Sequence, residues 1–313
     1  MQFETVGIVG LGLMGRGIAT VLLAHNIRVV AIDPNVESHS YTEKHIEISL
    51  PDLPEAANIT WRDRFIASTN FAELVDCQFV IESIPEEPEL KQQVLGQIEA
   101  AVAANVPIAT NTSALPISLL QSACQQPERV IGMHWGEPCH LTRFLEIIRG
   151  QQTDDTTTAA TISVGTQVGK DPTVVKKDVP GFIVNRLAYA MYREAFWLVE
   201  NDVADVETID RAFTNAISIW ADIAGPFRWM DMTGLAAYGQ AMKRLFPELS
   251  CEKSVPKMMQ QLVDSGAQGT ANCRGFYNYT PEEADQWRAR WVANTKRTRE
   301  LADLNYPSAK DPA

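Results

Sequence analysis

The pattern of hydrophobic and polar positions changes part-way along the chain. In the first part, short apolar runs alternate with stretches in which apolar residues recur every three to four positions, as on one face of a helix. Strands alternating with helices indicate βαβ units, so we predict an α/β, Rossmann-type, doubly wound and mostly parallel sheet. The predicted strands are Thr5 to Val9, Arg28 to Ile32, Phe79 to Glu82, Pro107 to Thr110, Val130 to Met133 and Phe144 to Ile148, and the helices between them are Met14 to Ala24, Pro88 to Val102 and Thr156 to Gln167.

Beyond Val179, only the helical pattern continues, in which apolar residues recur every three to four positions. The predicted helices there are Phe182 to Glu200, Asp205 to Ser218, Gly234 to Leu245 and Pro281 to Leu304. Trp287 and Trp291 lie four residues apart on the last of these, which favours a core or a seam between subunits. We therefore predict two domains, an α/β domain over residues 1–179 and an all-helical domain over residues 180–313.

Charge and cysteine content exclude several classes of partner. The 313 residues carry a net charge of -12, which argues against nucleic acid and anionic membrane as partners. The apolar stretches are too short for a membrane span, and the first residues lack the basic start of a signal peptide. The five cysteines show no C-x-x-C spacing, so we expect reduced thiols, no metal site and a cytoplasmic location.

A glycine-rich loop follows the first predicted strand. Its residues have the G-x-G-x-x-G pattern and are Gly10, Leu11, Gly12, Leu13, Met14 and Gly15. A loop of this kind between a strand and a helix places backbone N–H groups against a dinucleotide pyrophosphate. Asp33 ends the second strand, where its carboxylate can accept hydrogen bonds from the ribose hydroxyls and would repel a 2′-phosphate. The sequence therefore predicts NAD rather than NADP; the alternative is a glycine-rich turn with an unrelated aspartate.

His134 and Glu146 suit the proton transfer that must accompany hydride transfer. His134 ends a predicted strand, where ligands gather in open α/β sheets, and a neutral imidazole is a good base near neutral pH. Glu146 lies on the next predicted strand and could hold the second ring nitrogen. Each residue taken singly also has an ordinary structural explanation, as a polar residue at the rim of the sheet.

Four sequence blocks together resemble the 3-hydroxyacyl-CoA dehydrogenase family. They are Asn111-Thr112-Ser113, Gly132-Met133-His134, Leu145-Glu146-Ile147-Ile148 and Pro180-Gly181-Phe182-Ile183-Val184-Asn185-Arg186, in the family order. The resemblance implies that His134 is the base, that Glu146 is its partner, and that Ser113 and Asn185 bind the substrate oxygen. It also implies that Glu86, Lys91 and Asn111 lie near the nicotinamide and its ribose, although Lys91 equally fits a solvated lysine. A homodimer formed through the helical domain, which closes over the substrate, follows from the same resemblance.

Some segments depart from the family pattern and bear on the substrate. The family carries a long helical hairpin that helps to grip CoA, whereas the stretch from Asp33 to Phe79 is short and contains Pro51 and Pro54. Glu137 stands where the family places an Asn near the nicotinamide. Arg143 and Arg228 are candidates for binding a compact carboxylate, and the alternative for both is a surface arginine.

Three functions remain open on this basis. The first is NAD-dependent oxidation of a 3-hydroxyacyl-CoA, as in fatty acid metabolism. The second is the same CH–OH chemistry on a free small hydroxy acid or a hydroxymethyl-pyridine carboxylate. The third is a non-catalytic NAD-binding or crystallin-like protein, against which the complete set of predicted catalytic residues argues.

Overall fold

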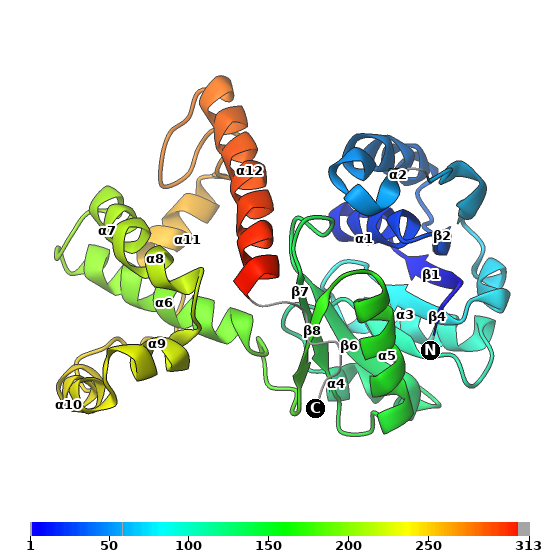
Figure 1. Cartoon of the computed structure of the whole chain (residues 1–313), viewed down its shortest axis with the longest axis horizontal. Coiled ribbons are helices and arrows are strands. Elements are labelled where there is room, and N and C mark those ends of the chain that lie inside the picture. The colour runs from blue at the N-terminus through cyan, green and yellow to red at the C-terminus, as the bar shows by residue number, and fades with distance from the viewer. Residues whose placement is uncertain (1, 58, 306–313) are drawn as a thin grey trace. The chain divides into compact units, whose positions relative to one another are not determined.

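A computed structural model describes residues 2–57 and 59–305 (Figure 1). Eight strands form one sheet in the order β3-β2-β1-β4-β5-β6-β7-β8. The strands are β1 Thr5–Val9, β2 Arg28–Ile32, β3 Phe65–Ser68, β4 Phe79–Glu82, β5 Ile108–Thr110, β6 Val130–Trp135, β7 Phe144–Ile148 and β8 Asp171–Val175. The pairs from β3 to β6 are parallel, while β7 is antiparallel to β6 and parallel to β8. The predicted mostly parallel α/β fold is confirmed.

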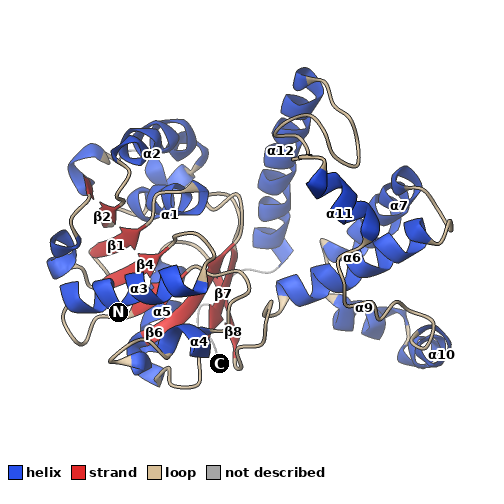
Figure 2. Cartoon of the chain, turned by 180° about the vertical axis from the view of Figure 1, so that it is seen from behind, coloured by secondary structure: helices blue, strands red, loops and turns tan. Residues whose placement is uncertain are grey.

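Helices cover both faces of this sheet (Figure 2). They are α1 Leu13–Ala24, α2 Val36–Ser49, α3 Pro88–Ala101, α4 Ile117–Gln121 and α5 Asp155–Gln167. One core joins α1, α2 and α5 to the sheet through residues such as Ile18, Ile46 and Val164, and a second core joins α3 and α4 to it through Leu95 and Leu120. Apolar side chains are thus buried on both faces of the sheet, which explains why the strands have continuous apolar sequences.

The segment between β2 and β3 contains one long helix. After the 14 residues of α2, the chain continues in the 3-10 turns Leu50–Asp52 and Pro54–Ala56, each with a proline at its start. Proline cannot donate the backbone hydrogen bond that a longer helix needs, so the two prolines end the regular helix here. The expectation that this segment does not form two long helices is confirmed.

Several element bounds differ from the predicted ones. Strands β3 and β8 are absent from the prediction, and helix α6 begins at Val184 rather than Phe182 because Phe182 has φ +48 in the turn before it. The predicted helix from Asp205 to Ser218 is divided by a π-helical segment, Phe213–Ile217. In these segments the β-branched and aromatic residues are not regularly spaced. The sequence pattern therefore did not define where the elements begin and end.

Contacts divide the chain into two compact units, the first ending at Asn185 and the second beginning at Arg186. The predicted boundary near Val179 precedes this division. The second unit holds most of α6 and the helices that follow it. These helices are α6 Val184–Glu200, α7 Val206–Ala212, α8 Ser218–Ala221, α9 Pro226–Thr233, α10 Leu235–Leu245, α11 Lys257–Asp264 and α12 Pro281–Asn305. Of the helices within the described ranges, none is long and apolar enough to cross a membrane.

Candidate active site

The glycine loop has the shape that a dinucleotide requires. Gly10 has φ +97, and a Cβ atom on it would lie 2.6 Å from the carbonyl oxygen of Ser83. A Cβ atom on Gly15 would lie 1.9 Å from the carbonyl oxygen of Gly10, so only glycine permits this close packing of the α1 helix on the loop. Gly12, in contrast, has no described atom within 4 Å of its Cβ position, and no side chain caps α1. Open space beside uncapped helix N–H groups fits the pyrophosphate of NAD.

Asp33 connects the glycine loop to the end of β2. Its Oδ2 accepts a hydrogen bond from the backbone N–H of Leu11 at 2.7 Å, and its Oδ1 accepts one from the N–H of Asn35 at 2.8 Å. Each carboxylate oxygen can accept a further hydrogen bond. Asp33 therefore shapes the loop through these two hydrogen bonds, and its predicted contact with the ribose hydroxyls is compatible with them.

His134 and Glu146 lie opposite each other on β6 and β7, which pair with this register. His134 Nδ1 is 2.9 Å from Glu146 Oε2, and both side chains are buried. Burial by itself would raise the pKa of Glu146, but hydrogen bonds from His134 and from the backbone N–H groups of Val184 and Ile183 together hold this pKa below its usual value. An ionised carboxylate only accepts, so Nδ1 carries the hydrogen and Nε2 has the lone pair for a substrate proton.

Two aromatic rings and the start of α6 fix this pair in place. The imidazole of His134 has the Phe144 ring edge-on at 5.4 Å and the Phe182 ring at 6.0 Å between centroids. Glu146 Oε1 accepts hydrogen bonds of 3.0 Å from the N–H groups of Ile183 and Val184. One carboxylate thus holds the imidazole with one oxygen and the first turn of α6 with the other.

Ser113 and Asn185 come together although 72 residues separate them in sequence. Asn185 Nδ2 donates to the backbone carbonyl of Ser113 at 2.8 Å. Glu86 accepts hydrogen bonds from the Thr112 hydroxyl at 2.5 Å and from the N–H groups of Ser113 and Ala114 at 2.8 and 3.1 Å. Glu86 therefore holds the loop after β5, on which the exposed Ser113 lies.

Burial of the Glu86 carboxyl group raises its pKa, whereas hydrogen bonding has the opposite effect. The bonds from Thr112, Ser113 and Ala114, together with the positive charge of Lys91, outweigh the burial and leave the pKa below its usual value. The carboxylate that holds the loop is consequently ionised at neutral pH.

Asn111 ties the ends of three strands together. Its Nδ2 donates to the Ser83 hydroxyl at 3.2 Å after β4, and its Oδ1 accepts from the N–H of Trp135 at 3.1 Å in β6. The amide therefore stands at the carboxyl ends of neighbouring strands, where it was predicted to lie beside the nicotinamide.

Lys91 is buried rather than solvated. Its Nζ donates to Glu82 Oε1 at 2.7 Å, and both side chains are fully buried. Glu82 also accepts a 2.6 Å hydrogen bond from the Thr110 hydroxyl. Sequence reasoning overlooked Glu82 because an acidic residue at the end of an apolar strand carries no signal of its partner, although the rarity of buried unpaired carboxylates could have suggested one.

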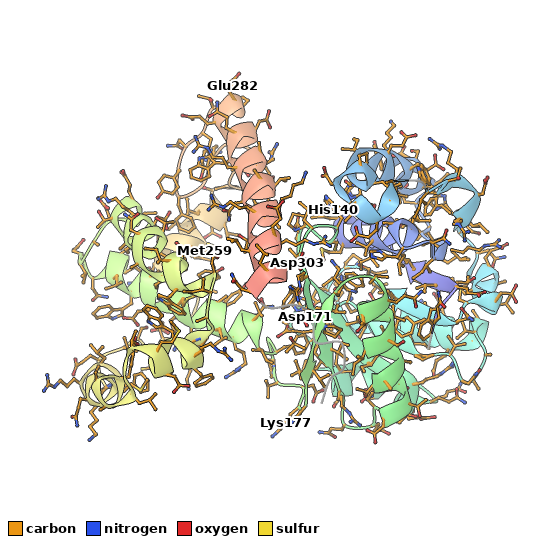
Figure 3. The ribbon with its side chains drawn as sticks, in the orientation of Figure 1. His140, Asp171, Lys177, Met259, Glu282 and Asp303 are labelled. Carbon is orange, nitrogen blue, oxygen red and sulfur yellow. The ribbon has the colours of Figure 1, made fainter. Side chains whose placement is uncertain are left out.

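The predicted carboxylate-binding arginines have different surroundings. Arg143 donates to Asp171 Oδ2 at 3.0 Å, and Asp171, labelled in Figure 3, begins strand β8. Arg228 is exposed on α9 in the second unit. Binding of a substrate carboxylate by either arginine stays a prediction, and for Arg143 a ligand would have to share the guanidinium with Asp171.

Glu137 follows His134 by three residues in the connection between β6 and β7. Burial raises the pKa of its carboxyl group, and the charge of Arg16 partly opposes that rise. The neighbouring Cys139 packs on Gly17 of α1, where a Cβ atom would lie only 2.8 Å from the cysteine Cβ. The connection that carries Glu137 therefore lies against the helix that follows the glycine loop.

Comparisons with known proteins match both parts of the chain to domains of one protein family. The family model described as "3-hydroxyacyl-CoA dehydrogenase, NAD binding domain" matches residues 5–179, and the model of the C-terminal domain matches residues 181–279. A 5-formyl-3-hydroxy-2-methylpyridine 4-carboxylate 5-dehydrogenase of Mesorhizobium japonicum is 32% identical over 92% of this chain and 94% of its own length. A 3-hydroxybutyryl-CoA dehydrogenase of Bradyrhizobium diazoefficiens is also 32% identical, over 88% of this chain and 95% of its own.

Two solved structures show different degrees of similarity. The structure of a 5-formyl-3-hydroxy-2-methylpyridine 4-carboxylic acid 5-dehydrogenase, described as an NAD+ dependent dismutase, has a TM-score of 0.88 at 29% identity and covers 98% of this chain and 100% of its own. An (S)-3-hydroxybutyryl-CoA dehydrogenase from Ralstonia eutropha has a TM-score of 0.74 at 34% identity and covers 89% of this chain and 100% of its own.

Proposed function

Because this chain belongs to the 3-hydroxyacyl-CoA dehydrogenase family and is an NAD-dependent dehydrogenase, we propose that His134 is its catalytic base and Glu146 the partner of that base. The 2.9 Å contact between His134 Nδ1 and Glu146 Oε2 carries this proposal. Bound NAD supplies the acceptor for the hydride. Nε2 of His134 takes the hydroxyl proton as the carbonyl forms, and the ionised Glu146 stabilises the resulting imidazolium.

Ser113 and Asn185 complete the proposed catalytic set. The exposed hydroxyl of Ser113 would donate to the substrate oxygen, and the amide of Asn185 is oriented by its bond to the Ser113 carbonyl. Donors aimed at an oxygen that gains negative charge lower the barrier, especially in the reverse, reducing direction. NAD would be positioned by the glycine loop together with Asp33, Glu86 and Asn111. Lys91 would contribute from the protein interior, through its charge beside Glu86.

Two features favour a small carboxylate over an acyl-CoA as substrate. Among the described residues between β2 and β3, α2 is the single long helix, and they form no long hairpin. Helix α12, of 25 residues, lies beyond residue 279, where the family model of the C-terminal domain ends. The pyridine-carboxylate dehydrogenase structure covers 98% of this chain at a TM-score of 0.88, whereas the 3-hydroxybutyryl-CoA dehydrogenase structure covers 89% at 0.74. We therefore favour an aromatic or heterocyclic carboxylate that bears a hydroxymethyl or formyl group.

The same residues could oxidise either group. A hydroxymethyl carbon loses a hydride to NAD and a proton to His134, which leaves an aldehyde. A hydrated formyl group is also a CH–OH carbon, and loss of the same hydride and proton leaves a carboxylic acid. Neither reaction needs a residue beyond the set already described.

A substrate panel tests this proposal. The purified protein is assayed for NADH absorbance with hydroxymethyl- and formyl-pyridine carboxylates, and separately with 3-hydroxybutyryl-CoA and, in reverse, acetoacetyl-CoA. We expect turnover with the first group to exceed turnover with the CoA thioesters by on the order of 100-fold in kcat/KM, which is the scale of a few lost polar contacts. The opposite ranking would assign the acyl-CoA reaction instead, and no turnover with either group despite tight NADH binding would favour a non-catalytic protein.

The helical unit carries the features of a subunit interface. Among its described residues, Ala224 and Ala284 alone are buried. Large apolar side chains along α6 remain exposed: Leu187, Tyr189, Met191, Tyr192 and Trp197. Trp287 and Trp291 on α12 are 54% and 46% exposed, so they do not form a core within the chain. Exposed apolar surface on this scale marks an association surface, and we propose a homodimer formed through this unit.

Sedimentation equilibrium tests the dimer. We expect a dimer at micromolar concentration that persists in 0.5 M salt, because apolar burial is not weakened by screening. Replacing Tyr189 and Tyr192 of α6, whose rings meet edge-on with centroids 5.5 Å apart, with Asp should shift the population toward monomer. The matched control replaces the exposed Tyr41 of α2 with Asp, since α2 lies in the other unit. A monomeric wild-type protein would refute the dimer.

A further inference from the structure

A buried cation, Lys91, lies between the carboxylates of Glu82 and Glu86. Lys91 Nζ has three acceptors within reach: Glu82 Oε1 at 2.7 Å, the carbonyl of Ile84 at 3.2 Å and Glu86 Oε2 at 3.7 Å. The side chains of Lys91 and Glu82 are fully buried, whereas that of Glu86 is 39% exposed. The ammonium is therefore bonded to Glu82 and only near Glu86.

The two carboxylates hold different parts of the molecule. Glu82 accepts from the N–H of Ile84 at 2.7 Å and from the Thr110 hydroxyl, so it joins β4 to β5 in the interior. Glu86 Oε1 is the acceptor for the Ser113 and Ala114 N–H groups. Glu86 faces Lys91 with its other oxygen, Oε2, so a shift of the carboxylate toward Lys91 would lengthen the hydrogen bonds between Oε1 and the loop.

We propose that Glu82 is a positioning residue for the active site: by binding Lys91 it leaves Glu86 available to hold the loop that presents Ser113. The effect of Glu82 on catalysis rests on the proposed function. Its effect on the loop does not, and can be measured without substrate or cofactor. Opposite charges in a poorly solvated site attract strongly, so the division of one cation between two anions sets where the more exposed anion, Glu86, lies.

Replacing Glu82 with Gln removes the charge and keeps the shape. The amide oxygen can still accept from Ile84 N–H and Lys91, and the amide nitrogen can donate to Thr110. Lys91 then has one anionic partner, Glu86, which closes the 3.7 Å gap and gives up its bonds to Ser113 and Ala114. The predicted result is a loop with less protected backbone N–H groups.

Hydrogen–deuterium exchange of the full-length protein without ligand measures this directly. In the peptide covering residues 111–115, we expect Glu82→Gln to raise the exchange rate about tenfold, the scale of a lost hydrogen bond to a charged group. The matched control is Glu99→Gln, since Glu99 is likewise a buried partner of a cation, Arg129, and accepts backbone N–H groups of Gln125 and Gln126. That variant should change exchange of the same peptide by less than about twofold.

Further variants separate charge from general damage. Glu82→Asp keeps the charge and should leave loop exchange within about twofold of the wild type. Adding Glu82→Gln to Glu86→Gln should not raise loop exchange further, since both substitutions act on the same contact. Unchanged loop exchange in Glu82→Gln, or a tenfold rise in Glu82→Asp, would overturn the positioning role. With the preferred substrate, Glu82→Gln should lower kcat more than NADH affinity, and equal losses in both would also count against it. Failure of the proposed function would instead appear as full activity of a His134 variant, with the exchange results unaffected.

Discussion

Replacing His134 with Asn is expected to lower kcat by about 10²- to 10⁴-fold, the usual contribution of a general base. The Asn amide can still donate to Glu146 across the 2.9 Å that separates Nδ1 from Oε2 in the native pair, so the fold and the NADH site should persist. Steady-state rates with the preferred substrate measure the first effect, and a fluorescence titration with NADH measures the second. We expect NADH affinity to change by no more than about threefold, which is under 1 kcal/mol.

The control for this variant is His25→Asn. His25 caps the end of α1 and bonds the carbonyl of Val21 at 2.9 Å, so it tests the same substitution outside the proposed site. Retention of more than a tenth of wild-type kcat by His134→Asn would remove the base assignment.

Glu146→Gln adds information on proton transfer. The neutral amide of Gln cannot stabilise the imidazolium of His134 that forms during the reaction, so the maximal rate should fall. Steady-state rates with the preferred substrate measure this effect, and a fluorescence titration with NADH checks that the cofactor site persists. An unchanged maximal rate would argue that Glu146 only supports the first turn of α6.

Substitutions in the glycine loop are expected to give the second large effect, and they separate folding from cofactor binding. A methyl group on Gly15 would lie 1.9 Å from the carbonyl oxygen of Gly10, so Gly15→Ala must displace the loop. We expect it to destabilise the protein by about 1–3 kcal/mol, as for overpacked sites. NADH affinity should fall on the order of 100-fold, because the displaced loop no longer brings its N–H groups to the phosphates.

Gly12→Ala should behave differently. Its Cβ would meet no described protein atom within 4 Å, so the midpoint of thermal unfolding should stay near that of the wild type. The same methyl group would occupy the space through which the backbone approaches the pyrophosphate, and NADH affinity should fall. Gly96→Ala in α3 is the control, since it also meets nothing within 4 Å of the described chain and should slightly raise stability without changing NADH affinity. Equal NADH binding by Gly12→Ala and Gly96→Ala would contradict the assignment of the loop.

Central strands were predictable because burial on both faces gives them unbroken apolar sequences. Strands β1, β2, β4 and β7 have the predicted bounds. Strands β3 and β8 lie at the two edges of the sheet and are only partly buried, and β8 also contains Pro172. An edge strand needs neither continuous apolar character nor every backbone donor, so its sequence resembles a loop.

Side-chain partners were predictable only where both strands of a pair had been recognised. The His134–Glu146 contact follows from two predicted neighbouring strands. Asp171, which accepts a hydrogen bond from Arg143, begins the overlooked strand β8. Because that strand was not predicted, Arg143 remained a candidate for binding a substrate carboxylate. Lys91 on a helix fitted a solvated lysine as well as a residue near the cofactor. Burial of its charge depends on Glu82, nine positions away in sequence and on another element, so the sequence did not reveal it.

The double attachment of Glu146 has a consequence for exchanging parts between related enzymes. Its two oxygens bind His134 on one side and the N–H groups of Ile183 and Val184 on the other, and Asn185 bonds the Ser113 carbonyl. A hybrid protein joined at Val179 would take the acceptors, Glu146 and the Ser113 carbonyl, from one parent. Their donors, the N–H groups of Ile183 and Val184 and the amide of Asn185, would come from the other. A hybrid joined after Asn185 would inherit the whole hydrogen-bonded set from a single parent, so a foreign helical domain grafted there would leave the base and its partners undisturbed.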